Sequence, residues 1–259
     1  MKNKEKNEKY WLDRAIQQDK KIQKDLKKVE KQLKKLYVEV SKEIKKELTY
    51  FYANKTDITE YEKYHLESTL KALNISLDKL FNEEEEILNK TLIQVYTEIF
   101  QDTLDSLEIE TSFNTINDNV VKEVIKTNWS GFTFSETIWE KHLPQLKNDV
   151  KQIFKQGLIR GDSLNDMAKA LNDKLNKGYS NAKRLVHTET CWIQNQATIN
   201  GYKEAEVKEY VFMAFLDSKT SKVCRDMDGE PVKIEEAKAG VNLPPLHPYC
   251  RSCIIPVID

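Results

Sequence analysis

The chain has 259 residues, of which 39% are hydrophobic and 32% are charged, so it is long enough for one large domain or two smaller ones with real cores. It contains no run of about 18 apolar residues, which excludes a membrane-spanning segment, and its first residues lack the apolar stretch of a secretory signal peptide. Four cysteines without an export signal favour reduced or metal-bound thiols over disulfides.

The formal net charge of -1 hides a separation of charge along the chain. Residues 1–52 carry 16 basic and 9 acidic side chains, a net of +7, whereas residues 53–110 carry 5 basic and 14 acidic ones, a net of -9. This asymmetry predicts either that the two segments dock on each other or that they present surfaces to different partners. Two solvated helix faces are the alternative interpretation.

The first predicted element is one long amphipathic helix over about residues 10–52, a stretch without glycine or proline. Its apolar side chains recur every three or four residues, as the seam of a helix that packs on a partner helix does. The seam residues are Ile22, Leu26, Val29, Leu33, Leu36, Val40, Ile44 and Leu48. At 1.5 Å per residue such a helix would be roughly 60 Å long.

Two further helices are expected before a linker. Residues 54–57 break the first helix, and a second helix begins at Thr59, a plausible N-cap, with an apolar stripe at Leu66, Leu70 and Leu73. A third helix is expected over about residues 77–107, in which the acidic run 83–86 is interpreted as a solvated face. Together the three predict an extended antiparallel hairpin or bundle, followed by a polar linker over residues 108–118.

The second half of the chain predicts an aromatic core segment followed by further helices. An aromatic-rich segment with Trp129, Phe132, Phe134 and Trp139 is expected to fill a core, and Ser135 is a candidate N-cap. Helices are expected at about 136–156, 163–176 and 181–205, the middle one bounded by Ser163 before it and Gly178 after it.

The C-terminal residues predict a small, mostly antiparallel sheet. The apolar run 209–216 is typical of a buried strand, Asp228 and Gly229 predict a tight turn into a short strand at 231–234, and residues 254–258 form an edge strand because Pro256 cannot donate to a ladder. The predicted fold class is therefore α+β: an extended helical region over residues 1–110, then a second region over 111–259, with helices at 136–205 and the sheet and a Cys/His loop at 209–259.

That loop carries the strongest chemical pattern in the sequence. His247, Cys250 and Cys253 follow one another at His-x2-Cys-x2-Cys spacing, and Cys224 lies upstream. Four nitrogen and sulfur donors can close a tetrahedral zinc site, and the neighbouring prolines stiffen the loop. The sequence therefore predicts a zinc site at these four residues, with buried, unliganded thiols and a hydrogen-bonded imidazole as the alternative.

Little else in the sequence indicates catalysis. His187 and Cys191 share a helix face, as a thiolate–imidazole pair would, but no orienting group or pocket motif accompanies them, and we interpret them as packing or surface residues. The sequence contains no phosphate-binding glycine loop, no Gly-x-Ser-x-Gly and no His-Glu-x-x-His. We therefore do not expect an enzyme.

Five segments, taken in order, resemble the phage Mu F-like head-morphogenesis, or minor capsid, family of tailed bacteriophages. They are NWSGFTFSETIW (128–139), GLIRG (157–161), RLVHTE (184–189), DSKTSKVCRDMDG (217–229) and PPLHPYCR (244–251). The best-defined stretch covers about residues 140–256. The positions that match the family's motifs are Arg184, Thr188, Glu189, Cys224, Asp228, Gly229, His247, Cys250 and Arg251. Cys253 stands where many members have Thr or a differently spaced cysteine.

The resemblance implies a virion protein inside the phage head, near the portal, that is incorporated during head assembly and acts in head morphogenesis, DNA packaging or DNA delivery. Expected partners are portal, capsid or scaffold proteins and packaged DNA, the DNA through the basic N-terminal helix, and self-association through the N-terminal seam is a further hypothesis. We expect Arg184 and Glu189 to anchor their helix to the terminal loop. The alternative function is a metal-assisted hydrolase or transferase carried in the virion, with Arg184, Glu189, Cys224 and His247 at its site.

Overall fold

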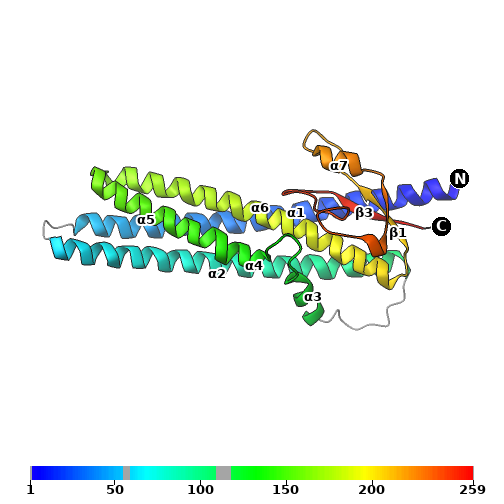
Figure 1. Cartoon of the computed structure of the whole chain (residues 1–259), viewed down its shortest axis with the longest axis horizontal. Coiled ribbons are helices and arrows are strands. Elements are labelled where there is room, and N and C mark those ends of the chain that lie inside the picture. The colour runs from blue at the N-terminus through cyan, green and yellow to red at the C-terminus, as the bar shows by residue number, and fades with distance from the viewer. Residues whose placement is uncertain (1, 55–58, 109–117, 259) are drawn as a thin grey trace. The chain divides into compact units, whose positions relative to one another are not determined.

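A computed structural model describes residues 2–54, 59–108 and 118–258, and it has the predicted α+β composition of long helices followed by a small antiparallel sheet (Figure 1). The predicted linker over 108–118 and the break at 54–57 lie largely outside these residues, and so does the side chain of Thr59. The elements are α1 (Lys2–Ala53), α2 (Thr59–Ser106), α3 (Asp118–Ile125), α4 (Phe134–Glu136), a π-helical turn (Thr137–His142), α5 (Leu143–Arg160), α6 (Leu164–Glu204), β1 (Glu209–Met213), α7 (Lys222–Met227), β2 (Pro231–Lys233), a 3-10 turn (Ile234–Glu236) and β3 (Cys253–Val257).

The contacts divide the chain into two compact units, each described here by itself. The bundle unit comprises residues 29–87 and 135–183, and the sheet unit comprises residues 1–28, 88–134 and 184–259. Each unit contains segments from both sides of residue 110. This division therefore differs from the division into residues 1–110 and 111–259 that the sequence predicted, and the latter stays a prediction. Among the described helices, none combines the length and the apolar character needed to cross a bilayer.

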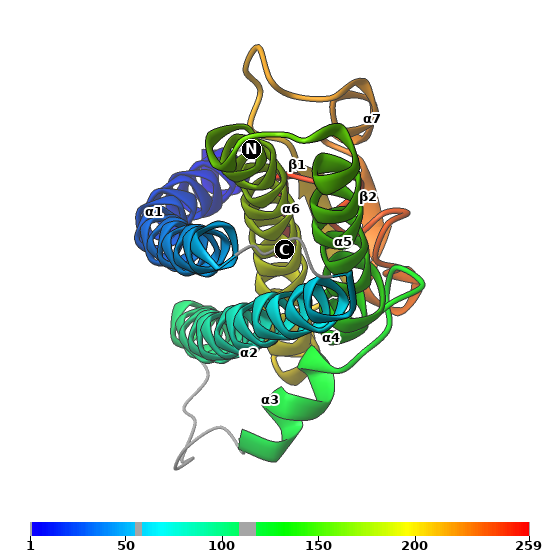
Figure 2. The same cartoon turned by 90° about the vertical axis from the view of Figure 1, so that its left-hand side faces the viewer.

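In the bundle unit, segments of α1, α2, α5 and α6 run side by side (Figure 1, Figure 2). The predicted seam of α1 is confirmed: all eight of its residues are buried, six in this unit and two, Ile22 and Leu26, in the sheet unit. Leu33 and Leu48 have no exposed surface. Tyr37 packs against Tyr179 of α6, and Phe51 packs against Phe154 of α5. These apolar side chains are therefore covered within one chain, and self-association stays a hypothesis.

The acidic run 83–86 of α2 is not the solvated face that we expected. Glu84 is fully buried and accepts a hydrogen bond of 2.8 Å from the hydroxyl of Tyr37. Glu85 accepts hydrogen bonds from the indole N–H of Trp139 at 2.8 Å and from Ser135. Ser135 is not the N-cap that we expected, because α4 begins at Phe134, one residue before it. Successive residues of a helix point in different directions, so a run of four must turn some of its side chains toward neighbouring helices.

Two helices are longer than predicted. α2 is continuous through residues 74–76, and α6 continues through Gly178, where we expected one helix to end and another to begin. Asn74 and Ser76 are only mildly unfavourable in a helix interior, and glycine costs about 1 kcal/mol there relative to alanine, which packing can offset. A Cβ atom on Gly178 would lie 3.0 Å from Cε1 of Tyr37, so the glycine permits close approach of α1 and α6 in this unit.

In the sheet unit, the strands form one antiparallel sheet in the order β2-β1-β3. Tyr210 of β1 pairs with Val232 on one side and with Pro256 on the other, so β3 is an edge strand, as the proline predicted. Ile199 and Tyr202 of α6 form one buried cluster with Tyr210 and Ile254, so the C-terminal part of α6 backs the sheet (Figure 1). Cys191 lies on α6, Cys224 on α7 and Cys253 on β3, and Cys250 lies in the loop before β3.

Candidate metal centre

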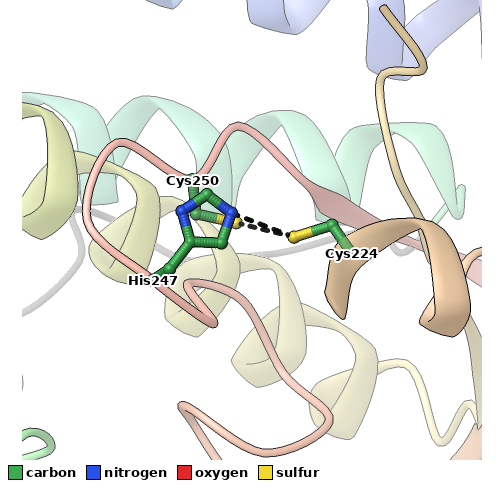
Figure 3. A group of neighbouring side chains, drawn as sticks. All are labelled: Cys224, His247 and Cys250. Atoms are coloured by element: carbon green, nitrogen blue, oxygen red, sulfur yellow. Dashed lines mark hydrogen bonds between the residues drawn. The ribbon is translucent and has the colours of Figure 1, made fainter. Parts of the chain in front are cut away.

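The side chains of Cys224, His247 and Cys250 converge in the sheet unit (Figure 3). The Cys224 sulfur lies 3.2 Å from Nε2 of His247 and 3.7 Å from the Cys250 sulfur, and all three donor atoms lie within 4.8 Å of one another. In a zinc tetrahedron with ordinary bond lengths, two sulfurs are about 3.8 Å apart, and a sulfur and a nitrogen are about 3.6 Å apart. The three groups therefore have a spacing suited to one metal ion.

Cys224 is positioned by α7, the helix that follows β1. Ser221 is the N-cap of this helix, and its hydroxyl accepts the backbone N–H of Cys224 at 3.3 Å. The predicted turn after α7 is present: Asp228 accepts the backbone N–H of Ala214 at 2.8 Å, and Gly229, at a φ of 85°, donates its N–H to the carbonyl of Phe212. These two motif residues thus fasten α7 to the end of β1.

His247 and Cys250 are brought together by a tight turn. The N–H of Cys250 donates to the carbonyl of His247 at 3.1 Å, Pro248 occupies the second position, and Tyr249 occupies the third with a φ of 60°. Proline second and a positive φ third are the features of a type II turn, in which a tyrosine at the third position is strained. The N–H of Tyr249 donates to Oγ1 of Thr188 on α6 at 3.2 Å, and its ring contacts the ring of His187.

The turn also fixes the protonation of His247. Its Nδ1 lies 2.8 Å from the carbonyl oxygen of Pro248, and since a carbonyl only accepts, Nδ1 carries the proton. The lone pair of Nε2 therefore faces the Cys224 sulfur. A ring nitrogen that donates to a backbone carbonyl while the other faces the donor cluster is the arrangement common to metal-binding histidines.

The cysteine thiols of this cluster are held in the protonated form when no cation is bound. A hydrogen bond involving the Cys191 thiol raises the pKa of Cys250 to about 11, with burial as a further cause. The pKa of Cys224 is also raised, first by its hydrogen bond with Cys250 and second by its burial. The Cys224 sulfur contacts both Nε2 of His247 and the Cys250 sulfur, and either thiol can be the donor between the two sulfurs.

Cys253 does not join the cluster, so we correct its prediction as a metal ligand. It is the first residue of β3, pairs with Met213 of β1, and packs with Met213 and Ala15 in a separate apolar group. Its pairing with Met213 at the start of β3 places its side chain in that group. Burial raises its pKa.

Cys191 of α6, which we interpreted as a packing residue, packs with Cys224 and Cys250 in one buried cluster. Nothing in the sequence spacing indicated this, because Cys191 lies more than thirty residues before Cys224 in the chain. All four cysteines are free and buried.

The remaining motif residues support the loops around the cluster. Arg251 forms an ion pair of 2.5 Å with Asp217, whose pKa is lowered by this contact. Glu189 is buried and accepts the indole N–H of Trp129 at 3.2 Å, and burial raises its pKa to about 7. The expectation that Glu189 anchors the terminal loop is therefore wrong; Thr188, the residue before it, makes that contact through Tyr249.

We expect replacement of Thr188 by valine to destabilise the chain by about 1 kcal/mol, because the backbone N–H of Tyr249 would lose its partner in the strained turn. Chemical denaturation followed by circular dichroism measures the change. Thr188→Ser, which keeps the hydroxyl, is the matched control. No loss in Thr188→Val, or a loss in Thr188→Ser as large as in Thr188→Val, would contradict this role of the hydrogen bond.

Comparison with known proteins shows what this chain is similar to. Residues 148–255, which include the whole cluster, match the family model described as Phage Mu protein F like protein. Over an alignment of 280 positions, the chain is also 25% identical to minor head protein GP7 of Bacillus phage SPP1, and this alignment covers 99% of the chain and 87% of that protein. The two matches confirm the resemblance to phage Mu F-like minor head proteins.

A second relative is an enzyme. The chain is 26% identical over 136 positions to the NAD(+)–arginine ADP-ribosyltransferase EFV of Enterococcus faecalis, an alignment that covers 51% of this chain and 28% of that protein. No solved structure matches the chain.

Proposed function

We propose that this chain is a minor structural protein of a tailed-phage head that acts in head morphogenesis. The observation that carries the proposal is the alignment with minor head protein GP7 of Bacillus phage SPP1 over nearly the whole chain, combined with the family match over the region that builds the Cys/His cluster. The structure supports a scaffolding role, because the motif residues mainly hold backbone turns and helix ends in place.

Association with phage heads during assembly tests this proposal. A tagged full chain, expressed during infection by the phage that encodes it, should sediment with procapsids after unassembled protein has been removed. The expected partners are other head components, with portal, capsid or scaffold proteins as the finer hypothesis. Recovery only in the unassembled fraction would overturn a structural role.

The basic surface of α1 supports a second part of the proposal, contact with packaged DNA. Its lysines in the bundle unit are exposed, and Lys31, Lys34, Lys42 and Lys45 follow one another at helical spacing along one face. Flexible ammonium groups on one helix face bind phosphates without distinguishing bases. Such binding would suit a protein located inside the head.

We expect the full chain to bind duplex DNA of unrelated sequences equally, with an affinity that falls steeply as salt rises. Replacing all four lysines of that face by alanine should weaken binding and lower the salt dependence, measured by fluorescence anisotropy. The matched control removes four exposed lysines from α5 and α6 of the same unit, namely Lys151, Lys155, Lys169 and Lys177. No binding of the unaltered chain at low salt, or equal weakening in both variants, would remove DNA from the proposal.

An enzymatic role has weaker support. The alternative site joined Arg184 and Glu189 to Cys224 and His247, but Glu189 bonds to Trp129 and is buried, whereas Cys224 and His247 face each other in the cluster. The transferase match covers only 28% of that enzyme. We infer a structural protein without ADP-ribosyl transferase activity. Incubation of the full chain with NAD+ and an arginine acceptor tests this inference, and ADP-ribose label on the acceptor would contradict it.

A further inference from the structure

The Cys/His cluster contains three donors that suit a metal ion, and a structural zinc site needs a fourth. Cys224, His247 and Cys250 come from α7 and from the turn before β3. Three protein ligands plus water would make an open site of the kind that enzymes use. The neighbourhood of the three donors therefore decides between an open and a closed site.

A further sulfur, that of Cys191, lies in the same buried cluster as Cys224 and Cys250. It is outside the group of three donors that lie within 4.8 Å of one another, and its thiol donates to the carbonyl of Ser252 at 3.6 Å. Cys253, by contrast, packs beside Ala15 and Met213. Cys191 is 5% exposed and Cys250 is 3% exposed, so water has little access to this side of the cluster.

Polar groups around the sulfurs are arranged as donors. The side-chain amide of Asn195 lies 3.7 Å from the Cys191 sulfur and donates to it, and the same amide donates to the backbone carbonyl of Ser252 at 3.2 Å. The proton on Nδ1 of His247 is held by Pro248. Hydrogen bonds from such outer groups stabilise thiolates and orient ligands around a metal ion.

We propose that Cys224, His247 and Cys250 bind one zinc ion and that Cys191 supplies the fourth sulfur, closing a structural site. Three thiolates and one neutral imidazole form a soft, tetrahedral donor set that selects zinc over the harder magnesium and calcium ions. The ion would tie α6, α7 and the terminal turn together at one point. A closed site has no position for substrate, so its role is to hold the terminal loop in place.

Zinc content of the full chain, purified under reducing conditions and exchanged against zinc, tests the proposal. We expect one zinc per chain in the unaltered protein and in Cys253→Ser, and none in Cys224→Ser. Circular dichroism at low temperature identifies which variants remain folded. A metal-free unaltered chain, or loss of zinc in Cys253→Ser to the same extent as in Cys224→Ser, would overturn the site.

The role of Cys191 needs a readout that counts ligands. In cobalt-substituted protein, the intensity of the sulfur-to-cobalt charge-transfer band increases with the number of thiolates, so Cys191→Ser should lower it by about a third, with three sulfurs reduced to two. Its zinc affinity, measured by competition with a chromophoric chelator, should fall more than about 100-fold, beyond the usual effect of losing an outer partner. An unchanged band with unchanged affinity would show an open site with three protein ligands.

Discussion

Replacement of Glu84 by glutamine should stabilise the chain by about 2–3 kcal/mol at pH 8 and change its stability little at pH 5. Burial raises the pKa of Glu84 from 4.5 to about 7, while the hydrogen bond from Tyr37 opposes that rise. The folded state therefore holds the proton more tightly than the unfolded state does. The resulting stability is fully present below about pH 4.5 and is lost as the pH rises through about 7, where a buried carboxylate must form.

Chemical denaturation at several pH values measures this difference between the two proteins. Glu83→Gln, one position earlier and partly exposed, is the matched control and should change stability by less than about 0.5 kcal/mol at either pH. Some pH dependence should persist in Glu84→Gln, because burial also raises the pKa of Glu189 to about 7. Parallel pH profiles for unaltered chain and Glu84→Gln would show that Glu84 does not titrate in this range.

Replacement of Trp192 by alanine should destabilise the sheet unit by about 3–5 kcal/mol. This indole is 1% exposed and stacks on Trp129 with ring centroids 6.0 Å apart. It also follows Cys191 directly on α6. Its loss would leave a cavity beside Trp129 and the buried Glu189, so both apolar contact and aromatic stacking are removed.

Lys203→Ala provides the comparison on the same helix, because Lys203 is exposed and its loss should alter stability by less than about 0.5 kcal/mol. Trp192→Phe should recover part of the loss, since a phenyl ring retains stacking with Trp129. The midpoint of denaturation followed by circular dichroism gives all three values. A loss below about 1 kcal/mol in Trp192→Ala would mean that this core is not packed as described.

The helical seam of α1 could be predicted from the sequence because the periodicity of apolar residues is a local property. Helix ends were harder to predict. Gly178 is a reasonable helix terminator in isolation, yet in the fold it lets α1 and α6 approach each other through Tyr37. Glu84 is polar and lies within an acidic run, and only the position of Tyr37, 47 residues away, shows why it is buried.

The candidate site was partly predictable for a similar reason. His247 and Cys250 are close in sequence, and Cys224 was included because a tetrahedral zinc site needs a further sulfur or nitrogen donor. Cys253 has suitable spacing, but the start of β3 places it against Met213. Cys191 could not be identified, because contact between α6 and the terminal turn depends on how the sheet packs on that helix.

The most direct measurement of the structural role is quantitative mass spectrometry of gradient-purified virions and procapsids from the phage that encodes this chain. A phage-head protein should be present in both kinds of particle at a constant, low number of copies relative to the major capsid protein. Its absence from both, with the chain abundant in the soluble fraction of the same infected cells, would contradict a role in the head.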